Sequence, residues 1–422
     1  MTLSYIIFVQ PAVLSTTGMD FGAVMVATCL AGALATFLMG ILANYPIALA
    51  PAMGHNFYFA FTVCGVVAAG GLGYSWQLAL GAVFLSGSIF ILLSFWGLRE
   101  KIVNAVPEGL KNAIAVGIGL LIALIGMEWA GIVVATPGTI VGLGDLGSPP
   151  VLLSLFGLVV IFALITLRVR GALLIGIIAT ALVGFPFGLV KYQGLVSLPP
   201  SLSPVFFKLN VGGIFANLSG FITVIFVFFF LDLFDTIGTL IGVSEQAGFI
   251  RKGRLPRARQ ALFSDAVGTV AGALLGTSTI TSYIESAAGI AEGGRTGLSN
   301  MVTGALMLLA LFFYPFAKMI GGGYEVTTGV RLYPVIAPAL IVVGSMMLRQ
   351  VKRIEWEDPT EALPAFLSLI VMPLTFSITE GIAFGFISYS FLKILTGQWK
   401  KVNWIIHLFA LLFLLRYLFL KG

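Results

Sequence analysis

The sequence predicts an all-α polytopic membrane protein, and three observations support this class. Hydrophobic residues make up 59% of the 422 residues, charged residues make up 9%, and mean hydropathy is +1.07. In a soluble domain, roughly a quarter of the residues are charged. The apolar runs are continuous over roughly 17–25 residues, which is the length of a membrane-spanning helix, and they lack the alternation of barrel strands.

About fourteen candidate spans follow one another along the chain. They cover residues 1–14, 21–41, 47–67, 76–97, 108–129, 150–169, 171–190, 213–241, 258–277, 279–296, 298–320, 331–349, 361–378 and 380–397. The first stretch is short for a span and lacks the basic region of a signal peptide. A last apolar stretch, about 403–420, either spans the membrane or lies at its interface, and the sequence leaves both open.

Basic residues predict the orientation of these spans. Cytoplasmic loops of membrane proteins carry an excess of Lys and Arg. If the N-terminus is cytoplasmic, the inside loops hold Arg99, Lys101, Arg168, Arg170, Arg251, Lys252, Arg254, Arg257, Arg259, Arg295, Arg349, Lys352 and Arg353. The outside loops then hold Lys191, Lys208, Lys318 and Arg331. We therefore predict a multi-pass protein of the cell membrane with a cytoplasmic N-terminus.

The two halves of the chain resemble each other. Each contains a Gly- and Ala-rich helix followed by a broken polar segment, and each ends in a similar pair of apolar helices. With seven spans per half, the two repeats would insert with opposite topology. Inverted repeats with a site near the membrane midplane are a recurring design of secondary transporters. We therefore predict a 7+7 inverted repeat.

Few residues are available for cofactor or metal chemistry. Cys29 and Cys64 lie in apolar runs, where cysteine behaves as a small buried hydrophobe. His55 and His407 are the only histidines, which is too few for a histidine-based metal site. The net charge of +6 reports membrane topology rather than nucleic-acid binding. We predict no cofactor, no metal and no nucleic-acid partner.

Three segments break the hydrophobic pattern. In Asn44–Phe59, Pro46 and Pro51 interrupt any continuous helix, which predicts a short extended piece and then a half-helix carrying Asn56. In TSTITSYIESAAG, the β-branched and polar run predicts a buried strand, with Glu285 in the first turn of the helix that follows.

The third segment, LDLFDTIGTL, places two carboxylates inside an apolar span. Asp232 and Asp235 are three residues apart and therefore share a helix face, and Thr236 and Thr239 add hydroxyl groups. A carboxylate at membrane depth costs several kcal/mol unless it is paired, hydrated or protonated. Together the three segments predict one polar pocket between apolar walls.

Each candidate residue also has a structural interpretation. Asp232 and Asp235 could be acids hydrogen-bonded to a neighbouring helix, and Asn56 could join two helices. Glu285 could simply stabilise a helix start. The remaining alternatives are packing for Phe57, Tyr58 and Tyr283, a structural role for His55, and a topology anchor for the basic cluster 251–259.

The same segments resemble a known family. APAMGHNFYF, DLFDTIGTLIG, TSYIESAAGIAEGGRTGL, YIIFVQP and PLTFSITEGIAFGFISY resemble the AzgA-like purine permeases, a branch of the nucleobase–cation symporter and xanthine/uracil permease superfamily. The resemblance covers nearly the whole chain. It implies a core domain (residues 1–97 and 201–325, spans 1–4 and 8–11) and a gate domain (98–200 and 326–422, spans 5–7 and 12–14 with the last apolar helix).

The resemblance also implies specific roles. Short antiparallel strands interrupt spans 3 and 10, and the substrate lies between these strands and the gate. The substrate-binding Glu of the family matches Glu285, the acid of span 8 matches Asp235, a second acid there matches Asp232, and the Asn of span 3 matches Asn56. The superfamily imports its substrate with protons, often as a homodimer in the lipid bilayer.

Three positions depart from the family pattern. Gln10 stands where the family has Asn before the Pro, and Ala52 and His55 vary the APGMG-x-N motif. The family usually has more residues at the start of span 1. Because these positions lie near the expected pocket, they bear on substrate preference.

Residues and resemblance together lead to one hypothesis, a purine nucleobase:proton symporter for adenine, guanine or hypoxanthine. Glu285 would accept from ring N–H groups, backbone amides at the half-helix starts would donate, and protonation of Asp235 would remove a charge when the loaded core moves. The full set of substrate-binding candidates is Glu285, Asp235, Asn56, Phe57, Thr239, Tyr283 and Ser286, and the proton-coupling candidates are Asp235, Glu285 and Asp232.

Other functions remain as alternatives. A carrier for an anion or for uracil or xanthine could use the same scaffold, although Glu285 would repel an anion. An intramembrane enzyme would need a nucleophile–base or metal set, and two histidines make that a poor fit. A channel would show a charged ring or a repeated filter motif, and the sequence contains neither.

Overall fold

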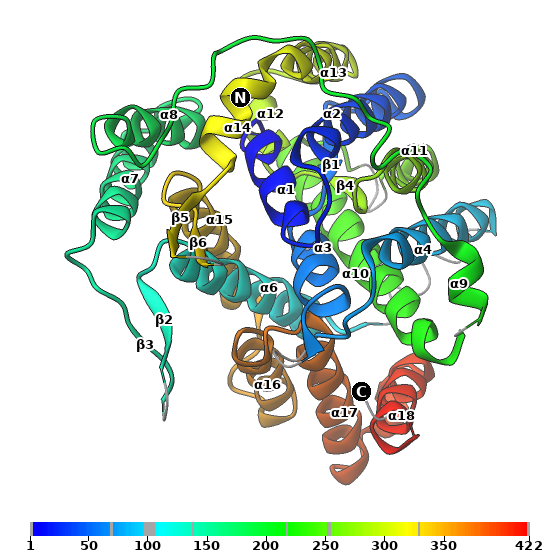
Figure 1. Ribbon diagram of the computed structural model, residues 1–422. Coiled ribbons are helices and arrows are strands. Elements are labelled where there is room, and N and C mark those ends of the chain that lie inside the picture. The colour runs from blue at the N-terminus through cyan, green and yellow to red at the C-terminus, as the bar shows by residue number, and fades with distance from the viewer. Residues whose placement is uncertain are drawn as a thin grey trace.

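The computed structural model describes residues 3–67, 71–96, 106–136, 139–216, 218–250, 255–327 and 330–419, and these are mostly helical (Figure 1). Several positions used above lie outside the described residues. They are Arg99, Lys101, Arg251, Lys252 and Arg254 of the predicted cytoplasmic loops, and the predicted domain boundary at 97/98.

Within these ranges, seven helical segments are long and apolar enough to cross a membrane. They are built from α2 (Phe21–Leu38), α4 (Trp76–Trp96), α6 (Glu108–Trp129), α7 (Pro149–Thr166), α10 (Leu218–Gln246), α13 (Leu298–Ala310) with α14 (Tyr314–Gly321), and α17 (Ile378–Leu395). Shorter apolar helices are α1 (Ile6–Ser15), α8 (Ala172–Gly184), α16 (Pro359–Thr375) and α18 (Trp404–Phe419). The chain is therefore a multi-pass membrane protein.

The helices pack in two groups. In the first, α2 and α4 pack against α11 (Ala258–Leu275), and α13 packs on α2 and α10 on α4. In the second, α6 packs against α16, α17 and α15 (Ala337–Met347), and α7 against α8 and α15. The helix α1 and the half-helix α3 (Met53–Phe57) lie centrally in the view, and α3 contacts both α6 and α10 (Figure 1).

Two short strands meet in the interior, as the sequence predicted for segments 3 and 10. The strand β1 (Leu49–Pro51) pairs antiparallel with β4 (Ile280–Ser282), with Ala50 opposite Thr281. Backbone bonds extend the pairing beyond both strands, from Ala52 N–H to the Thr279 carbonyl and from Tyr283 N–H to the Ala48 carbonyl. All residues of both strands are buried, so this ladder satisfies backbone groups that could not reach water.

Each strand is also fastened to the helix before it by a threonine. The Thr36 hydroxyl of α2 donates to the Leu49 carbonyl and accepts from the Leu49 N–H, both at 2.9 Å. The Thr269 hydroxyl of α11 donates to the Ile280 carbonyl at 2.9 Å and accepts from the Ile280 N–H at 3.2 Å. These bonds occupy groups on the outer edges of the strand pair.

Beyond each strand the chain returns to helix. The strand β1 leads into α3 and a π-helical turn (Tyr58–Val63), and β4 leads into the short helix α12 (Ser286–Ala291). Glu285 therefore immediately precedes α12 rather than lying within its first turn. A second π-helical turn, Met39–Ala43, ends α2 just before the polar segment.

The hairpins and several helix limits differ from the prediction. The strands β2 (Val133–Thr136) and β3 (Ile140–Leu143) form one hairpin, and β5 (Tyr324–Thr327) and β6 (Val330–Leu332) form another. The second hairpin takes residues that we assigned to a span from 331. Pro334 and Pro338 explain why α15 begins only at Ala337, because proline fits the first turn of a helix and not its interior. The remaining short helix, α9 (Val211–Ala216), packs against α4.

Close approach of β4 to α11 depends on a glycine, which generates a prediction. A Cβ atom at Gly268 would lie 2.7 Å from the Ala35 Cβ and 3.1 Å from the Ile280 Cγ2. Because Ala35 belongs to α2 and Ile280 to β4, Gly268→Val should push both α2 and β4 away from α11 and lower the free energy of unfolding by about 1–3 kcal/mol. The measurement is thermal unfolding in detergent. The matched control is Gly242→Val on α10, because a Cβ there meets no atom of the described residues within 4 Å; equal losses in both variants would contradict the packing argument.

Candidate functional site

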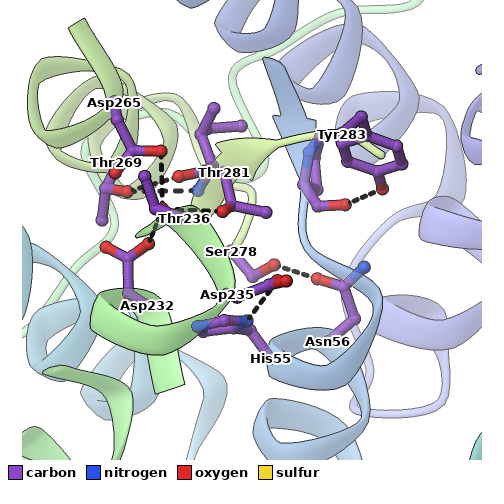
Figure 2. A network of polar contacts seen from close by, with 12 residues as sticks. His55, Asn56, Asp232, Asp235, Thr236, Asp265, Thr269, Ser278, Thr281 and Tyr283 are labelled. Carbon is purple, nitrogen blue, oxygen red and sulfur yellow. Dashed lines mark hydrogen bonds and ion pairs between the residues drawn. The ribbon is translucent and has the colours of Figure 1, made fainter. Parts of the chain in front are cut away.

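The polar segments predicted from the sequence converge around the β1–β4 pair (Figure 2). The half-helices α3 and α12 follow the two strands, and α10 passes beside them. The side chains form four neighbouring sets of contacts. Each set joins segments that lie far apart in the sequence.

The first set is a carboxylate–hydroxyl cluster. The Thr236 hydroxyl of α10 lies 3.1 Å from Asp232 Oδ1, 2.8 Å from Asp265 Oδ1 of α11 and 2.8 Å from the Thr281 hydroxyl of β4. All four residues are buried, and Figure 2 shows Thr236 between the two carboxylates. A hydroxyl carries one hydrogen and can donate to only one of the two carboxylates. The second contact becomes a hydrogen bond when that carboxyl group carries its own proton, so the cluster is suited to holding a proton.

The second set contains Asp235 and His55. Asp235 Oδ2 lies 4.0 Å from His55 Nδ1, and the Asp235 side chain is 38% exposed while His55 is 2% exposed. Neither ring nitrogen of His55 has a hydrogen-bond partner among the residues that the structure describes. Although Asp232 and Asp235 are three residues apart on α10, they contact different groups. Asp232 belongs to the first cluster, whereas Asp235 faces the half-helix α3.

The third set links α1 to both interrupted segments. Gln10 Nε2 donates to the Thr277 hydroxyl at 3.0 Å and to the Ser278 hydroxyl at 3.2 Å. The Ser278 hydroxyl in turn donates to Asn56 Oδ1 on α3 (Figure 2). Thr28 of α2 shares a hydrogen bond with Thr277 at 3.2 Å. This chain of bonds holds Asn56 in place from α1.

The fourth set is centred on Glu285, where β4 gives way to α12. Glu285 Oε1 accepts a hydrogen bond from the Tyr5 hydroxyl at 2.8 Å. Tyr5 is 1% exposed and stands immediately before α1. The helix α10, which carries Asp235, contacts both β4 and α12, the two elements on either side of Glu285. The structure thus brings Asp235 and Glu285 into one region, although 50 positions separate them in the sequence.

The other candidate residues have more local contacts. The Tyr283 hydroxyl donates to the Pro51 carbonyl, and the Ser286 hydroxyl accepts from the Ala48 N–H at 3.0 Å, so both polar groups bind the backbone of the β1 segment. Thr239 is buried one turn after Asp235. Phe57 stacks on Phe61 at 5.8 Å and meets Trp129 of α6 edge-on at 6.4 Å. Phe57 therefore lies where the two helix groups meet.

Sequence reasoning missed Asp265 and Tyr5. Asp265 is a carboxylate in the apolar run ALFSDAVGTVAGALL, and an acid inside a candidate span is itself a functional signal. Tyr5 had no such signal, because tyrosines are common in membrane helices and its partner lies in the second half of the chain. Gln10 was noted only as a departure from a family motif. No group of three His, Cys, Asp or Glu side chains suited to a metal occurs in the described part of the chain.

Comparison with known proteins agrees with this geometry. The sequence profile named Permease family matches residues 1–384, which is most of the chain. The chain belongs to this permease family. The resemblance inferred from the sequence motifs is thereby confirmed, and the protein is a transporter rather than an enzyme.

Curated relatives resemble the permease over nearly its whole length. It is 50% identical to a putative permease of Methanocaldococcus jannaschii, over 100% of this chain and 93% of that protein. It is 43% identical to the adenine permease AdeP of Escherichia coli, over 100% of this chain and 91% of that protein. It is 42% identical to the guanine/hypoxanthine permease PbuO of Bacillus subtilis, over 98% and 94%.

A solved transporter structure shares the helical fold at low sequence identity. The transmembrane domain of a cyanobacterium bicarbonate transporter, BicA, matches with a TM-score of 0.60 and 15% identity, over 92% of the permease and 95% of that domain. At this identity the likeness concerns the fold alone.

The carboxylate–hydroxyl cluster generates a prediction about stability. Thr236→Val keeps the side-chain shape but removes the hydroxyl between Asp232 and Asp265. Loss of a buried hydrogen-bond partner of a carboxylate should cost about 1–3 kcal/mol of unfolding free energy. Thermal unfolding in detergent would measure this loss.

Two variants serve as controls. Thr236→Ser should retain most of the stability, and the exposed Thr166→Val, which loses a bond to the Phe162 carbonyl, should change it little. A Thr236→Val protein as stable as Thr236→Ser would contradict the shared-hydroxyl interpretation.

Proposed function

We propose that the permease is a purine nucleobase:proton symporter that imports adenine, guanine or hypoxanthine by alternating access. The observation that carries this proposal is the placement of two carboxylates inside a membrane protein: Asp235 lies on α10, which packs against β4 and α12, and Glu285 lies between β4 and α12. Relatives that share more than 40% of its residues are named adenine permease and guanine/hypoxanthine permease. The proposed setting is the cell membrane.

Substrate recognition would centre on Glu285 and Asn56. A purine is planar and presents neighbouring donors and acceptors, and a carboxylate can accept from its ring N–H groups. Asn56 offers an amide that can both donate and accept. Phe57, which stacks on Phe61 and contacts Trp129, offers an aromatic face for the ring. Thr239, Tyr283 and Ser286 would shape the surrounding pocket, the last two through their bonds to the β1 segment.

Proton coupling would use the acids around α10. Asp235 is partly exposed and its Oδ2 lies 4.0 Å from His55 Nδ1. Its carboxyl group could therefore exchange a proton with water or with a bound substrate. Asp232 would act with Asp265 through the shared Thr236 hydroxyl. A protonated carboxyl crosses an apolar environment at much lower cost than a carboxylate. Proton binding would therefore favour movement of the loaded site, and Glu285 would couple that step to the substrate.

The proposed architecture is a 7+7 inverted repeat of about fourteen spans with a cytoplasmic N-terminus. The parallel between Thr36–Leu49 and Thr269–Ile280 supports a repeat, because each threonine fastens the first residue of a strand to the preceding helix. The group of α2, α4, α10, α11 and α13 corresponds to the proposed core, and the group of α6, α7, α15, α16 and α17 to the proposed gate. A homodimer is the assembly that the family resemblance implies.

The alternative is a carrier for another nucleobase, such as uracil or xanthine, or for an anion. The likeness to a bicarbonate transporter domain concerns the fold alone. An anion would meet Glu285 and Asp235 at this site, and like charges in a low-dielectric interior repel. The carboxylates therefore favour a neutral planar substrate with N–H donors.

Uptake by the purified protein in lipid vesicles would test the proposal. With an imposed inward proton gradient, radiolabelled adenine, guanine or hypoxanthine should accumulate, and a protonophore should abolish the accumulation. Glu285→Gln and Asp235→Asn should each lower uptake at least about tenfold, because each removes an interaction with a charged group.

The control variant for this assay is Glu325→Gln, which changes an acid that is 56% exposed in the β5–β6 hairpin. Its uptake should match that of the unmodified protein. Accumulation that follows sodium and ignores the protonophore would refute proton coupling. Normal transport by both site variants would refute the assignment of Glu285 and Asp235.

A further inference from the structure

The position of the Glu285 carboxylate depends on α1, a helix from the other end of the chain. The Tyr5 hydroxyl donates to Glu285 Oε1 at 2.8 Å, and Gln10 on the same helix donates to Thr277 and Ser278. These contacts lie on either side of β4, since Thr277 and Ser278 precede the strand and Glu285 follows it. The helix α1 therefore holds both ends of the segment that carries the candidate substrate-binding acid.

The two partners differ in rigidity. A glutamate side chain rotates about three bonds before its carboxylate, whereas a tyrosine side chain rotates about two and its ring is large. Tyr5 is 1% exposed, so its ring is fixed by packing, and its hydroxyl can hold the more mobile acid. A hydrogen bond to a charged acceptor is also stronger than one between neutral groups. Tyr5 is thus suited to select one orientation of the Glu285 carboxylate.

We propose that Tyr5 is a positioning residue for substrate recognition. By donating to Oε1, it orients the carboxylate so that Oε2 accepts from a ring N–H of the nucleobase. This inference rests on the proposed function of Glu285 as the substrate acceptor. It assigns to Tyr5 a contribution to substrate affinity through Glu285, without contact to the substrate itself.

Tyr5→Phe removes only the hydroxyl and tests the assignment. Substrate Kd and KM should rise about tenfold, which is within the range for loss of one bond to a charged group, while the maximal rate of uptake stays close to normal. Competition binding on the purified protein gives Kd, and vesicle uptake gives KM and the maximal rate.

A matched control is available in the second helix group. The Tyr389 hydroxyl of α17 donates to Glu361 Oε1 of α16 at 3.0 Å, so Tyr389→Phe loses a similar bond away from the site. It should lower thermal stability without changing Kd. Equal increases of Kd in both variants, or a Tyr5→Phe protein within twofold of normal, would overturn the assignment. The Glu285→Gln variant separates the two proposals. If its substrate affinity is normal, the proposed function of Glu285 fails. If its affinity falls while that of Tyr5→Phe stays normal, only the role of Tyr5 fails.

A different observation concerns α18, whose relation to the membrane the sequence left open. This helix lies antiparallel beside α17 (Figure 1). His407 Nδ1 is 2.8 Å from the Ser390 hydroxyl at one end, and Arg416 is 2.7 Å from Glu380 Oε1 at the other. At 1.5 Å per residue, both helices advance by about 14–15 Å between these contacts. The outer face of α18 is apolar and exposed, through Leu408, Leu411, Leu412 and Leu415.

The contacts of α18 with the two helix groups differ in kind. With α17 they combine ring contacts, such as Phe386 with Phe409, with a hydrogen bond and an ion pair, and the Tyr417 hydroxyl also donates to Glu380. With α10 they are ring contacts, in which Phe409 lies 5.2 Å from both Phe226 and Phe230. Hydrogen-bonded contacts are directional, whereas apolar ring contacts tolerate lateral displacement.

We infer that α18 lies in the membrane beside α17 and moves with it, and that its aromatic face is the surface along which α10 shifts. The second part of this inference rests on the proposed alternating access. The first part does not, because it follows from the contacts between α17 and α18 and from the apolar outer face.

Cross-linking between cysteine pairs would test both parts, in a protein whose Cys29 and Cys64 have been replaced by alanine. A short bifunctional thiol reagent should join Ser390→Cys to His407→Cys and leave uptake within twofold of the unlinked protein. The same reagent joining Phe226→Cys to Phe409→Cys should lower uptake at least tenfold, and Phe226→Cys with Phe413→Cys, whose native rings lie 5.7 Å apart, provides a second pair.

Each pair is compared before and after linking, so any loss caused by the substitutions cancels. Failure of the 390–407 pair to link in membranes would refute the placement of α18 beside α17. Normal uptake with α10 linked to α18, or loss of uptake with α17 linked to α18, would refute the movement of α18 with α17. If vesicle uptake is absent in the unmodified protein, the proposed function fails, whereas the placement of α18 is still decided by linking.

Discussion

The antiparallel pairing of β1 with β4 is the interaction on which the rest of the structure depends. Both strands interrupt segments in the interior of a membrane protein, where an unpaired backbone group costs several kcal/mol. The ladder, its two flanking backbone bonds and the hydroxyls of Thr36 and Thr269 supply partners for these groups. Because the two strands are antiparallel, β1 leads into α3 and Asn56 at one end of the pair, and β4 leads into Glu285 and α12 at the other end.

Electrostatics then decides how the interior can hold so many acids. Asp232 and Asp265 are buried beside Thr236, whereas Asp235 and Glu285 are partly exposed, and a buried carboxylate needs hydrogen bonds or a proton. Hydroxyl groups supply part of the required hydrogen bonding, from Thr236 to one acid of the first cluster at a time and from Tyr5 to Glu285. A site built from acids and hydroxyls is poor at holding an anion and well suited to N–H donors and protons, which is the chemistry of the proposed symport.

The division into two helix groups places this site at a boundary. Phe57 on α3 contacts Trp129 on α6, so an aromatic contact next to Asn56 joins the two groups. The helix α18 touches both, through polar bonds to α17 and ring contacts to α10.

Much of the architecture could be predicted from the sequence, because the relevant signals are local. Long apolar runs identified the spans, Pro46 and Pro51 identified a broken segment, and the run TSTITSYI identified a buried strand. The acids of LDLFDTIGTL and Glu285 stood out because charge inside an apolar run is costly. Only the tertiary structure decided the partners: that β1 pairs with β4, that Asp232 and Asp235 turn to different neighbours, that Asp265 joins the cluster, and that Tyr5 holds Glu285. These contacts join residues separated by up to 280 positions, and no local pattern records which distant segment a side chain will face.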